Sequence, residues 1–270
     1  MPTTTAPIDI AALESFANEL ADMAVPASLE LFRHPLDIER KEDSSPVTIA
    51  DKRIESILRE AIAGRYPDHG IFGEEHGAEH LDRRHVWVVD PIDGTKSFIS
   101  GWPLFGTLIA CLEDGKPVVG VISMPAIGER WSARRGGQAR FAGKPCAVSR
   151  CTRLAEARIY TTSPDAFDEA ERALYLDISS RAALRRFGGD CYSYGLLASG
   201  HVDAVIEMQL QPYDYMALVP VIEAAGGVIT DWNGQPLTLD SPGRVVAAAT
   251  PELHAELLAL LGADAPARAS

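Results

Sequence analysis

The chain has 270 residues, 46% of them hydrophobic and 23% charged, which is the composition of a soluble globular protein with one large domain or two lobes. Its net charge of −13 at pH 7 argues against a general nucleic-acid-binding surface and against a surface for anionic membranes. No apolar run approaches the ~20 residues that span a bilayer, and the N-terminus lacks the basic and apolar regions of a signal peptide.

In the first part of the chain, apolar residues recur at spacings of three and four, which predicts amphipathic helices. Pro26 falls inside the first of these helices and is expected to kink it. A run rich in β-branched residues just before Asp90 predicts a buried strand that stops at this acid. The elements expected here are helices over 8–33 and about 51–64, a loop or extended segment over 34–48, and strands over 70–73 and 86–89.

The stretch after that strand, Asp90-Pro91-Ile92-Asp93-Gly94-Thr95, combines features of a cation site and of an anion site. Pro91 holds the backbone extended, Gly94 permits a tight bend, and Thr95 stands where a short helix could begin. Paired carboxylates bind hard cations, whereas free backbone N–H groups at such a turn bind anions. The stretch therefore predicts a magnesium-dependent site for a phosphate ester, in which bound cations would offset the repulsion between an acidic protein and phosphate.

A plain strand-to-helix turn is the alternative interpretation of this stretch, because Asp-Pro and Asp-Gly pairs are common turn formers. Two further acidic motifs argue against it: Gly73-Glu74-Glu75 upstream and Tyr213-Asp214-Tyr215 downstream. A cluster of three or four carboxylates is explained well by cation binding and poorly by a structural role.

After residue 100 the first signal is a hairpin, because two strand-like runs are joined at Asp114-Gly115. Beyond about residue 145 strands and helices alternate, as in an α/β lobe. The elements expected are strands over 105–113, 117–124, 131–134, 139–141, 158–162, 185–187, 202–207, 228–231 and 244–248, an edge segment over 144–149, and helices over 165–180, 191–200, 214–225 and 251–261. We expect a single domain over 1–270, with an N-terminal lobe of about 1–145, a C-terminal lobe of about 146–262 and a frayed tail over 263–270.

The four cysteines, Cys111, Cys146, Cys151 and Cys191, show no C-x-x-C spacing. A zinc ribbon or a disulfide framework is therefore not expected. Reduced thiols in a cytoplasmic protein are the simplest interpretation.

Three motifs together resemble those of the inositol monophosphatase family, and the resemblance spans most of the chain. They are Gly73-Glu74-Glu75, the six residues from Asp90 to Thr95, and Asp214 leading into a helix that ends at Gly226-Gly227. The resemblance implies a layered αβαβα sandwich of the α/β (α+β) class, the fold of the inositol monophosphatases and sugar phosphatases. It also implies a homodimer that hydrolyses small phosphate monoesters with Mg²⁺ and is inhibited by lithium. From the negative charge, no nucleic acid or membrane is expected as a partner.

The resemblance further implies a set of metal ligands. Glu74, Asp90 and the carbonyl oxygen of Ile92 would hold one Mg²⁺ ion, and Asp90, Asp93 and Asp214 would hold a second. Glu74 would also touch a third, weaker ion or the water between them. Two cations can generate a hydroxide and stabilise the leaving alkoxide, which is what hydrolysis of a phosphate monoester requires.

Other matching residues are implied to act around the metals. Thr95, with Glu74, would help to deprotonate the attacking water, and Asp93 and the N–H groups of Gly94 and Thr95 would contact the phosphate. Lys41 and Asp51 match the family's outer segment near the third metal.

Within the family, the chain resembles the histidinol-phosphate phosphatase branch, which converts L-histidinol phosphate to L-histidinol in histidine biosynthesis. The stretches that carry this resemblance are 98–107, 188–192 and 211–214, together with Lys96, where inositol phosphatases frequently have a second Thr. Histidinol phosphate has an ammonium and an imidazole, which pair with carboxylates, whereas a neutral polyol has no use for a buried charge. Asp190 and Glu207 are the candidate substrate-binding carboxylates.

Alternatives remain for the roles of these two residues and for the function of the protein. Asp190 could cap the helix that follows it, and Glu207 could be a strand-end acid bonded to a neighbouring helix. The substrate could be inositol 1-phosphate or phosphoadenosine phosphate. A non-enzymatic role as a partner of a transcription complex is a further alternative, and the intact acidic motifs argue against it.

Overall fold

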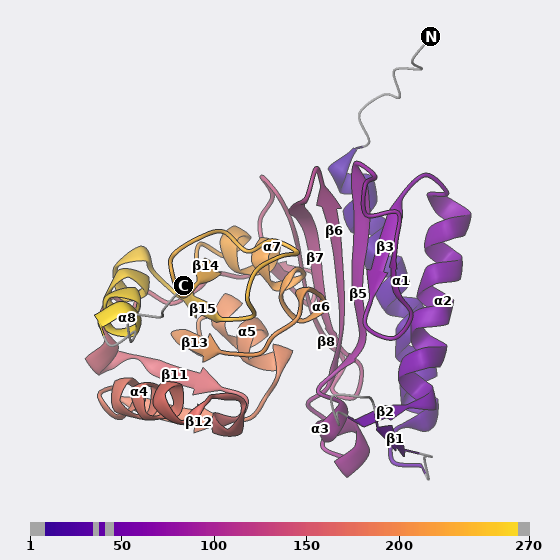
Figure 1. The fold of residues 1–270 in the computed structure, drawn as a ribbon. Helices are drawn as coiled ribbons and strands as arrows, with labels where there is room; N and C mark the ends of the chain where they lie inside the picture. Colours follow the sequence, from indigo (N-terminus) through magenta and orange to yellow (C-terminus); the bar gives the residue numbers. More distant parts are fainter. Residues whose placement is uncertain (1–8, 35–37, 41–45, 264–270) are drawn as a thin grey trace.

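The structure is a computed structural model that describes residues 9–34, 38–40 and 46–263. Figure 1 shows five layers: α1 and α2, a larger sheet, α5 to α7, a smaller sheet, and α4 with α8. The expected αβαβα sandwich is therefore confirmed. None of the helices in the described part of the chain is both long and apolar enough to cross a membrane.

The helices begin where local capping groups and apolar spacing allow. The Asp9 side chain accepts a hydrogen bond from the N–H of Ala11 at 3.0 Å and caps α1, which continues through Pro26. Asp168 and Glu171 form a capping box at the start of α4. The helices span Ile10–Leu31 (α1), Ile49–Arg65 (α2), Thr95–Ser100 (α3), Glu169–Ser180 (α4), Cys191–Ala198 (α5), Pro212–Tyr215 (α6), Leu218–Ala224 (α7) and Pro251–Ala263 (α8), with 3₁₀ turns at Leu154–Glu156 and Pro164–Ala166.

The larger sheet is organised around β5, whose residues His85 to Ile92 are all buried. Trp87 and Val89 pack towards α1 and α2, while Val86 and Val88 pack towards α5 and α7, so both faces of this strand are covered. The order is β10-β9-β8-β7-β6-β5-β3-β4, and β3 runs parallel to β5. Its strands span Gly70–Gly73 (β3), Gly77–Glu79 (β4), His85–Asp93 (β5), Gly106–Glu113 (β6), Lys116–Met124 (β7), Glu129–Arg134 (β8), Arg140–Phe141 (β9) and Lys144–Pro145 (β10).

The smaller sheet has the order β12-β11-β13-β15-β14. Tyr175 and Ile178 of α4 and Leu253 and Leu257 of α8 form a core with one face of this sheet. Its strands span Arg158–Thr161 (β11), Leu184–Phe187 (β12), Ala204–Glu207 (β13), Val228–Asp231 (β14) and Val245–Ala248 (β15). A separate antiparallel pair is formed by Ile38–Arg40 (β1) and Pro46–Thr48 (β2), within the segment expected to be loop or extended.

Several details differ from the expectations. The strand expected to stop at Asp90 continues to Asp93, and the short β4 was not expected. The helix expected over 214–225 is divided into α6 and α7, because Pro220 has no N–H to donate to the carbonyl of Met216. The expected edge over 144–149 is limited to β10. The division of one domain into lobes near residue 145 stays a prediction, and the tail 264–270 lies outside the described residues.

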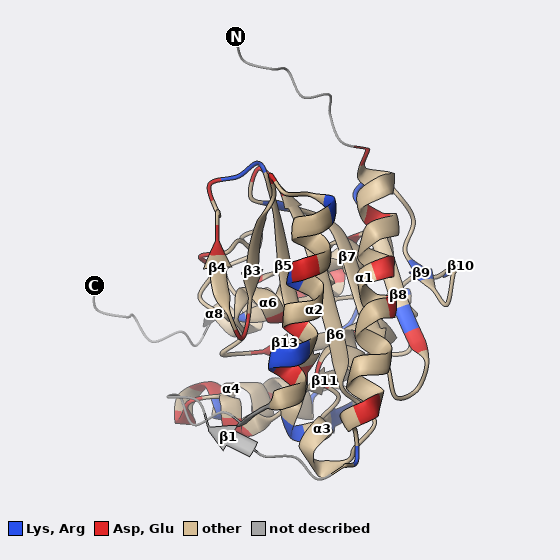
Figure 2. Ribbon diagram, turned by 90° about the vertical axis from the view of Figure 1, so that its right-hand side faces the viewer, with Lys and Arg blue, Asp and Glu red and all other residues tan. Residues whose placement is uncertain are grey.

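The charged residues of the outer helices α1 and α2 do not form a basic surface. Figure 2 shows acidic and basic residues interleaved along α2, whereas the charged residues of α1 are all acidic. Arg134 pairs with Glu14 of α1, and Arg130 pairs with Asp22 of α1 at 2.8 Å. Neither helix therefore presents a basic face, and basic residues of β8 pair with the acidic residues of α1.

Candidate active site

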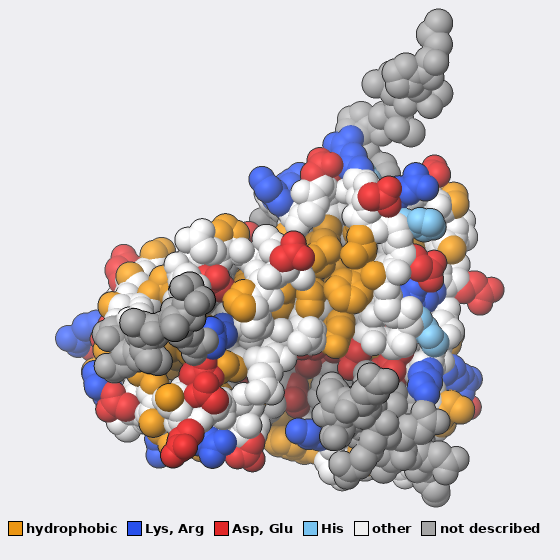
Figure 3. All heavy atoms as spheres, in the orientation of Figure 1, with side chains coloured by type: hydrophobic (Ala, Val, Ile, Leu, Met, Phe, Trp, Pro, Cys, Tyr) orange, Lys and Arg blue, Asp and Glu red, His pale blue; other side chains and the backbone are white. Residues whose placement is uncertain are grey.

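A cavity of about 460 Å³ lies where the C-terminal end of β5 meets α3, α5, α6 and the end of β13. Figure 3 shows acidic side chains gathered in a hollow between the part built on the larger sheet and the part built on the smaller sheet. The lining includes the predicted residues Glu74, Asp90, Ile92, Asp93, Gly94, Thr95, Asp190, Glu207 and Asp214. Residues that are far apart in the sequence therefore meet in one cavity.

The end of β5 brings two of the carboxylates to the same side. Residues 90 and 93 are three positions apart and would face opposite sides of a regular strand. Asp90 pairs with Leu108 and Asp93 with Gly106, so one extra residue forms a β-bulge between them. Oxygen atoms of Asp90, Asp93 and Asp214 consequently lie within 4.8 Å of one another.

Short polar contacts fix the geometry of this bulge. The Oδ1 atom of Asp90 accepts the N–H of Ile92 at 2.9 Å, and the Thr107 hydroxyl donates to the carbonyl of Pro91 at 2.9 Å. The Thr95 hydroxyl donates to the Ile92 carbonyl at 3.2 Å. The carbonyl predicted to be a metal ligand and the threonine predicted to activate water are therefore adjacent.

The electrostatics of the carboxylate cluster favour a bound cation. Burial, followed by the charge of Glu74, raises the pKa of Asp90 well above its usual range. Burial, followed by the charge of Asp190, does the same to the pKa of Asp93. Burial raises the pKa of Asp214 to about 7, although its Oδ2 accepts the N–H of Gln211 at 2.6 Å. Buried carboxylates that repel one another form a set of hard oxygen donors, which suits Mg²⁺.

The Asp190 side chain points away from the helix that it precedes. It makes no capping hydrogen bond to α5 and instead accepts the Ser97 hydroxyl of α3 at 3.0 Å. The N–H of Cys191 at the start of α5 donates to Asp93 Oδ2 at 2.6 Å. Asp190 has a backbone φ of 45°, and burial raises the pKa of its carboxyl. The capping alternative for Asp190 is therefore wrong.

Glu207, at the end of β13, lines the cavity and already has partners in the protein. Its carboxylate accepts the N–H of Thr162 at 2.8 Å, the Thr162 hydroxyl, and the hydroxyl of Tyr194 on α5 at 3.2 Å. Burial raises the pKa of Glu207 to about 7. A role of Glu207 in binding substrate stays a prediction.

Of the two residues predicted to lie outside the metal ligands, Lys41 and Asp51, the structure describes only Asp51. Asp51 is buried in the first turn of α2 and does not line the cavity, and Lys41 lies outside the described residues. Sequence reasoning did not single out Ser97 or Thr162, which hold the two candidate substrate-binding carboxylates. A lone Ser or Thr in a loop or short helix has no local signal that would reveal this.

Comparisons with known proteins agree with the geometry. Residues 9–264 match the inositol monophosphatase family. The chain is 44% identical over 258 residues to a bifunctional phosphatase IMPL2, chloroplastic, of Arabidopsis thaliana, covering 91% of this chain and 75% of that protein. It is 36% identical over 248 residues to a histidinol-phosphatase of Chlorobaculum parvum, covering 91% of this chain and 95% of that protein.

Among solved structures, an inositol monophosphatase from Zymomonas mobilis superposes with a TM-score of 0.87 at 40% identity, covering 95% of this chain and 100% of that one. These relatives agree on phosphatase chemistry and differ in the substrate for which they are named. The carboxylate cluster at the end of β5 has the donor atoms that a metal-dependent phosphatase requires. The chain therefore belongs to the inositol monophosphatase family of metal-dependent phosphatases.

Proposed function

We propose that this protein is a Mg²⁺-dependent histidinol-phosphate phosphatase that converts L-histidinol phosphate to L-histidinol in histidine biosynthesis. The observation on which this proposal mainly depends is Asp190, a half-buried carboxylate that lines the cavity and does not cap its helix. A neutral polyol offers nothing to balance such a charge, whereas the ammonium or imidazole of histidinol phosphate does. The similarity to a histidinol-phosphatase of Chlorobaculum parvum supports the same substrate.

The proposed metal ligands are Glu74, Asp90, Asp93, Asp214 and the Ile92 carbonyl, for two ions. When bound, Mg²⁺ would supply positive charge for the phosphate and lower the pKa of a coordinated water. By the family resemblance, Lys41 and Asp51 would belong to the outer segment associated with a third ion.

The chain's own groups would complete the reaction. In this proposal the Thr95 hydroxyl and Glu74 form the path by which the attacking water loses its proton. The N–H groups of Gly94 and Thr95 hold the phosphate, because Gly94 turns the backbone with φ of 82° into the start of α3. Asp190 would orient the histidinol part of the ester. Glu207 would do the same only after it loses one of its hydrogen bonds to Thr162 or Tyr194.

The proposed setting is a cytoplasmic homodimer that acts on a small-molecule phosphate ester. The main alternative substrate is inositol 1-phosphate, favoured by the 40% identity to an inositol monophosphatase from Zymomonas mobilis. Phosphoadenosine phosphate is a further alternative within the same fold.

A panel of phosphate esters tests the proposal. Released phosphate would be measured with L-histidinol phosphate, inositol 1-phosphate, phosphoadenosine phosphate and glycerol 2-phosphate, each with Mg²⁺ and with EDTA. We expect the highest kcat/KM with histidinol phosphate and loss of all activities in EDTA. A higher kcat/KM with inositol 1-phosphate would overturn the substrate assignment while leaving the phosphatase chemistry intact.

A further inference from the structure

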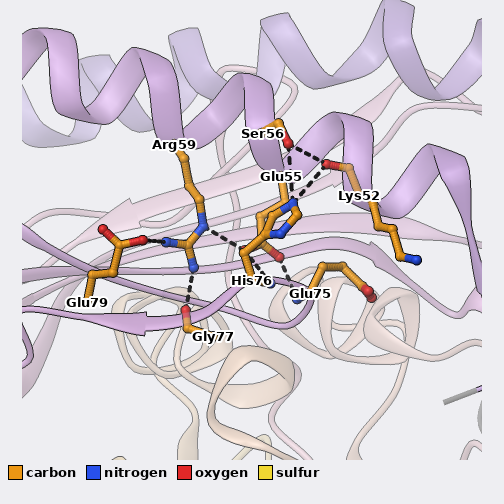
Figure 4. A network of polar contacts seen from close by, with 8 residues as sticks. All are labelled: Lys52, Glu55, Ser56, Arg59, Glu75, His76, Gly77 and Glu79. Atoms are coloured by element: carbon orange, nitrogen blue, oxygen red, sulfur yellow. Dashed lines mark hydrogen bonds and ion pairs between the residues drawn. The ribbon is translucent and has the colours of Figure 1, made fainter.

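A buried carboxylate outside the cavity holds the turn that contains Glu74. Glu55 lies on α2, and its side chain is completely buried. Its Oε2 accepts the N–H of Glu75 at 2.6 Å, and its Oε1 accepts the N–H of His76 at 3.1 Å (Figure 4). The peptide unit that follows Glu74 is therefore bonded directly to a charged acceptor on a helix.

Gly73, the residue before Glu74, has no side chain, which leaves room for the Glu55 carboxylate. A Cβ atom on Gly73, the last residue of β3, would lie 2.1 Å from Glu55 Oε1 and 2.3 Å from Glu55 Cδ. No side chain other than hydrogen fits at this position while Glu55 keeps its place. Glu55 thus contacts the chain on both sides of Glu74.

Contacts with Arg59 hold Glu55 itself in place. Arg59, one turn later on α2, donates from Nε to Glu55 Oε1 at 2.8 Å. Its other nitrogens contact the Gly77 carbonyl and Glu79 Oε1, the latter at 3.0 Å (Figure 4). The buried charge of Glu55 is therefore compensated, and β4 is bound to the same helix.

The ring of His76 adds a further contact between the turn and α2, since its Nε2 lies 3.2 Å from Ser56 Oγ (Figure 4). The turn of three residues, 74–76, between β3 and β4 is thereby attached to the helix at several points. A rigid attachment of this kind is more than a solvent-facing turn requires, and it is what a metal ligand requires.

We propose that Glu55 is a positioning residue for Glu74 and thereby sets the Mg²⁺ affinity of the carboxylate cluster; this rests on the proposed role of Glu74 as a metal ligand. The carboxylate of Glu55 fixes the backbone on both sides of Glu74, so the Glu74 side chain starts from a defined place at the edge of the cavity. Groups that orient metal ligands in this way typically account for 10–100-fold in metal affinity or activity.

Glu55→Gln tests the proposal, because it keeps the size of the side chain but removes the charge and turns an NH₂ group towards one of the N–H donors. Mg²⁺ would be titrated calorimetrically into the metal-free protein. We expect the Kd for Mg²⁺ to rise by about tenfold or more, and the Mg²⁺ concentration for half-maximal activity to rise in parallel. At saturating Mg²⁺ most of kcat should return.

Ile62→Val is the matched control, since Ile62 is buried on the same helix within the apolar core. It should lower the melting temperature slightly and leave the Kd for Mg²⁺ unchanged. If Glu55→Gln lowers the melting temperature but binds Mg²⁺ as tightly as the unaltered chain, Glu55 is structural only and the proposal is wrong. If Glu55→Gln does not fold, Arg59→Gln decides: a weaker Mg²⁺ affinity supports the proposal, and an unchanged one overturns it.

The same titration separates this proposal from the proposed function. An unaltered chain that binds no Mg²⁺ would contradict both. A chain whose Mg²⁺ affinity depends on Glu55 but which hydrolyses none of the esters would contradict the proposed function alone.

Discussion

Asp93 Oδ2 accepts a hydrogen bond of 2.6 Å from the N–H of Cys191, a residue 98 positions away. This bond joins the end of β5 to the start of α5. It leaves the neighbouring carboxylate, Asp190, free of helix capping and directed to Ser97 on α3. One cavity therefore has two kinds of carboxylate: a cluster suited to metal ions and a separate acid suited to the organic part of an ester.

Replacing Asp90 should abolish turnover without harming the fold. Burial, followed by the repulsive charges of Glu74, Asp93 and Asp214, raises the pKa of Asp90. Asp90→Asn should lose nearly all phosphate release at saturating Mg²⁺, while its melting temperature in EDTA stays equal or rises. Asp177→Asn, at an exposed site on α4, is the control and should change neither. Substantial activity in Asp90→Asn would exclude a metal site bridged by Asp90.

The hydroxyl of Thr95 should matter for kcat rather than for KM. Thr95→Ala removes the group that contacts the Ile92 carbonyl but keeps the backbone N–H groups of α3. Turnover should fall by roughly two to four powers of ten, the usual contribution of a positioned proton-transfer group. Steady-state kinetics of Thr95→Ala and Thr95→Ser measure this, and the serine variant should retain most of kcat. A defect confined to KM would mean that Thr95 only binds phosphate.

Asp190→Asn should change substrate preference. The amide oxygen can still accept the Ser97 hydroxyl, but the negative charge is lost. For histidinol phosphate, the transition-state stabilisation calculated from kcat/KM should fall by about 1.5–3 kcal/mol, the cost of one charge-assisted contact. Hydrolysis of glycerol 2-phosphate, which offers no cation, should hardly change. If both activities fall equally, or neither falls, Asp190 does not recognise the substrate's cation.

Gly94→Ala should be more damaging than an equivalent change at another left-handed glycine. Gly94 has a φ of 82°, and an added Cβ would lie 2.8 Å from Asp190 Oδ2. Gly115, in the hairpin between β6 and β7, has a φ of 74° and nothing within 4 Å of such a Cβ. Both variants should lose ~1–2 kcal/mol from backbone strain, and only Gly94→Ala should also lose kcat/KM. Urea unfolding and steady-state kinetics of the two variants measure this. Equal effects of the two variants on stability and on kcat/KM would show that the Asp190 side chain can move away from the added Cβ without cost.

Stability should decrease as the pH falls below neutrality because of His69. Its Nδ1 accepts the indole N–H of Trp87 at 3.0 Å, which requires an unprotonated nitrogen. Burial, then the charge of His85, lowers the pKa of His69 to about 4, whereas an unfolded His titrates near 6.5. Between these values the unfolded chain binds more protons, so the free energy of unfolding falls as the pH falls.

His69→Gln should therefore reduce the loss of stability between pH 7 and pH 5, measured by urea unfolding at both pH values. The glutamine can still accept from Trp87 but cannot be protonated. His201→Gln, at an exposed position, is the control. Between pH 7 and pH 5 its free energy of unfolding should fall by as much as that of the unaltered chain. An unchanged pH dependence in His69→Gln would contradict this assignment.

The sequence alone determined the features that depend on neighbouring residues. The β-branched run before Asp90 predicted the buried strand β5, and helical spacing predicted α1 and α2, because these patterns follow directly from the periods of strand and helix. The contiguous stretch Asp90 to Thr95, with the two other acidic motifs, was specific enough to indicate the family, which the comparisons confirmed. The candidate metal ligands that it named line one cavity.

Tertiary structure decided what depends on contacts between distant segments. The bulge that turns Asp90 and Asp93 to the same side follows from pairing with β6, and the direction of Asp190 follows from Ser97 and from the bond between Asp93 and Cys191. The hydrogen bond from the N–H of Glu75 to Glu55 joins residues 20 positions apart, one in the turn after β3 and the other on α2. Periodicity and local propensity describe one element at a time, so they cannot reveal which buried polar groups of separate elements become hydrogen-bond partners when those elements pack.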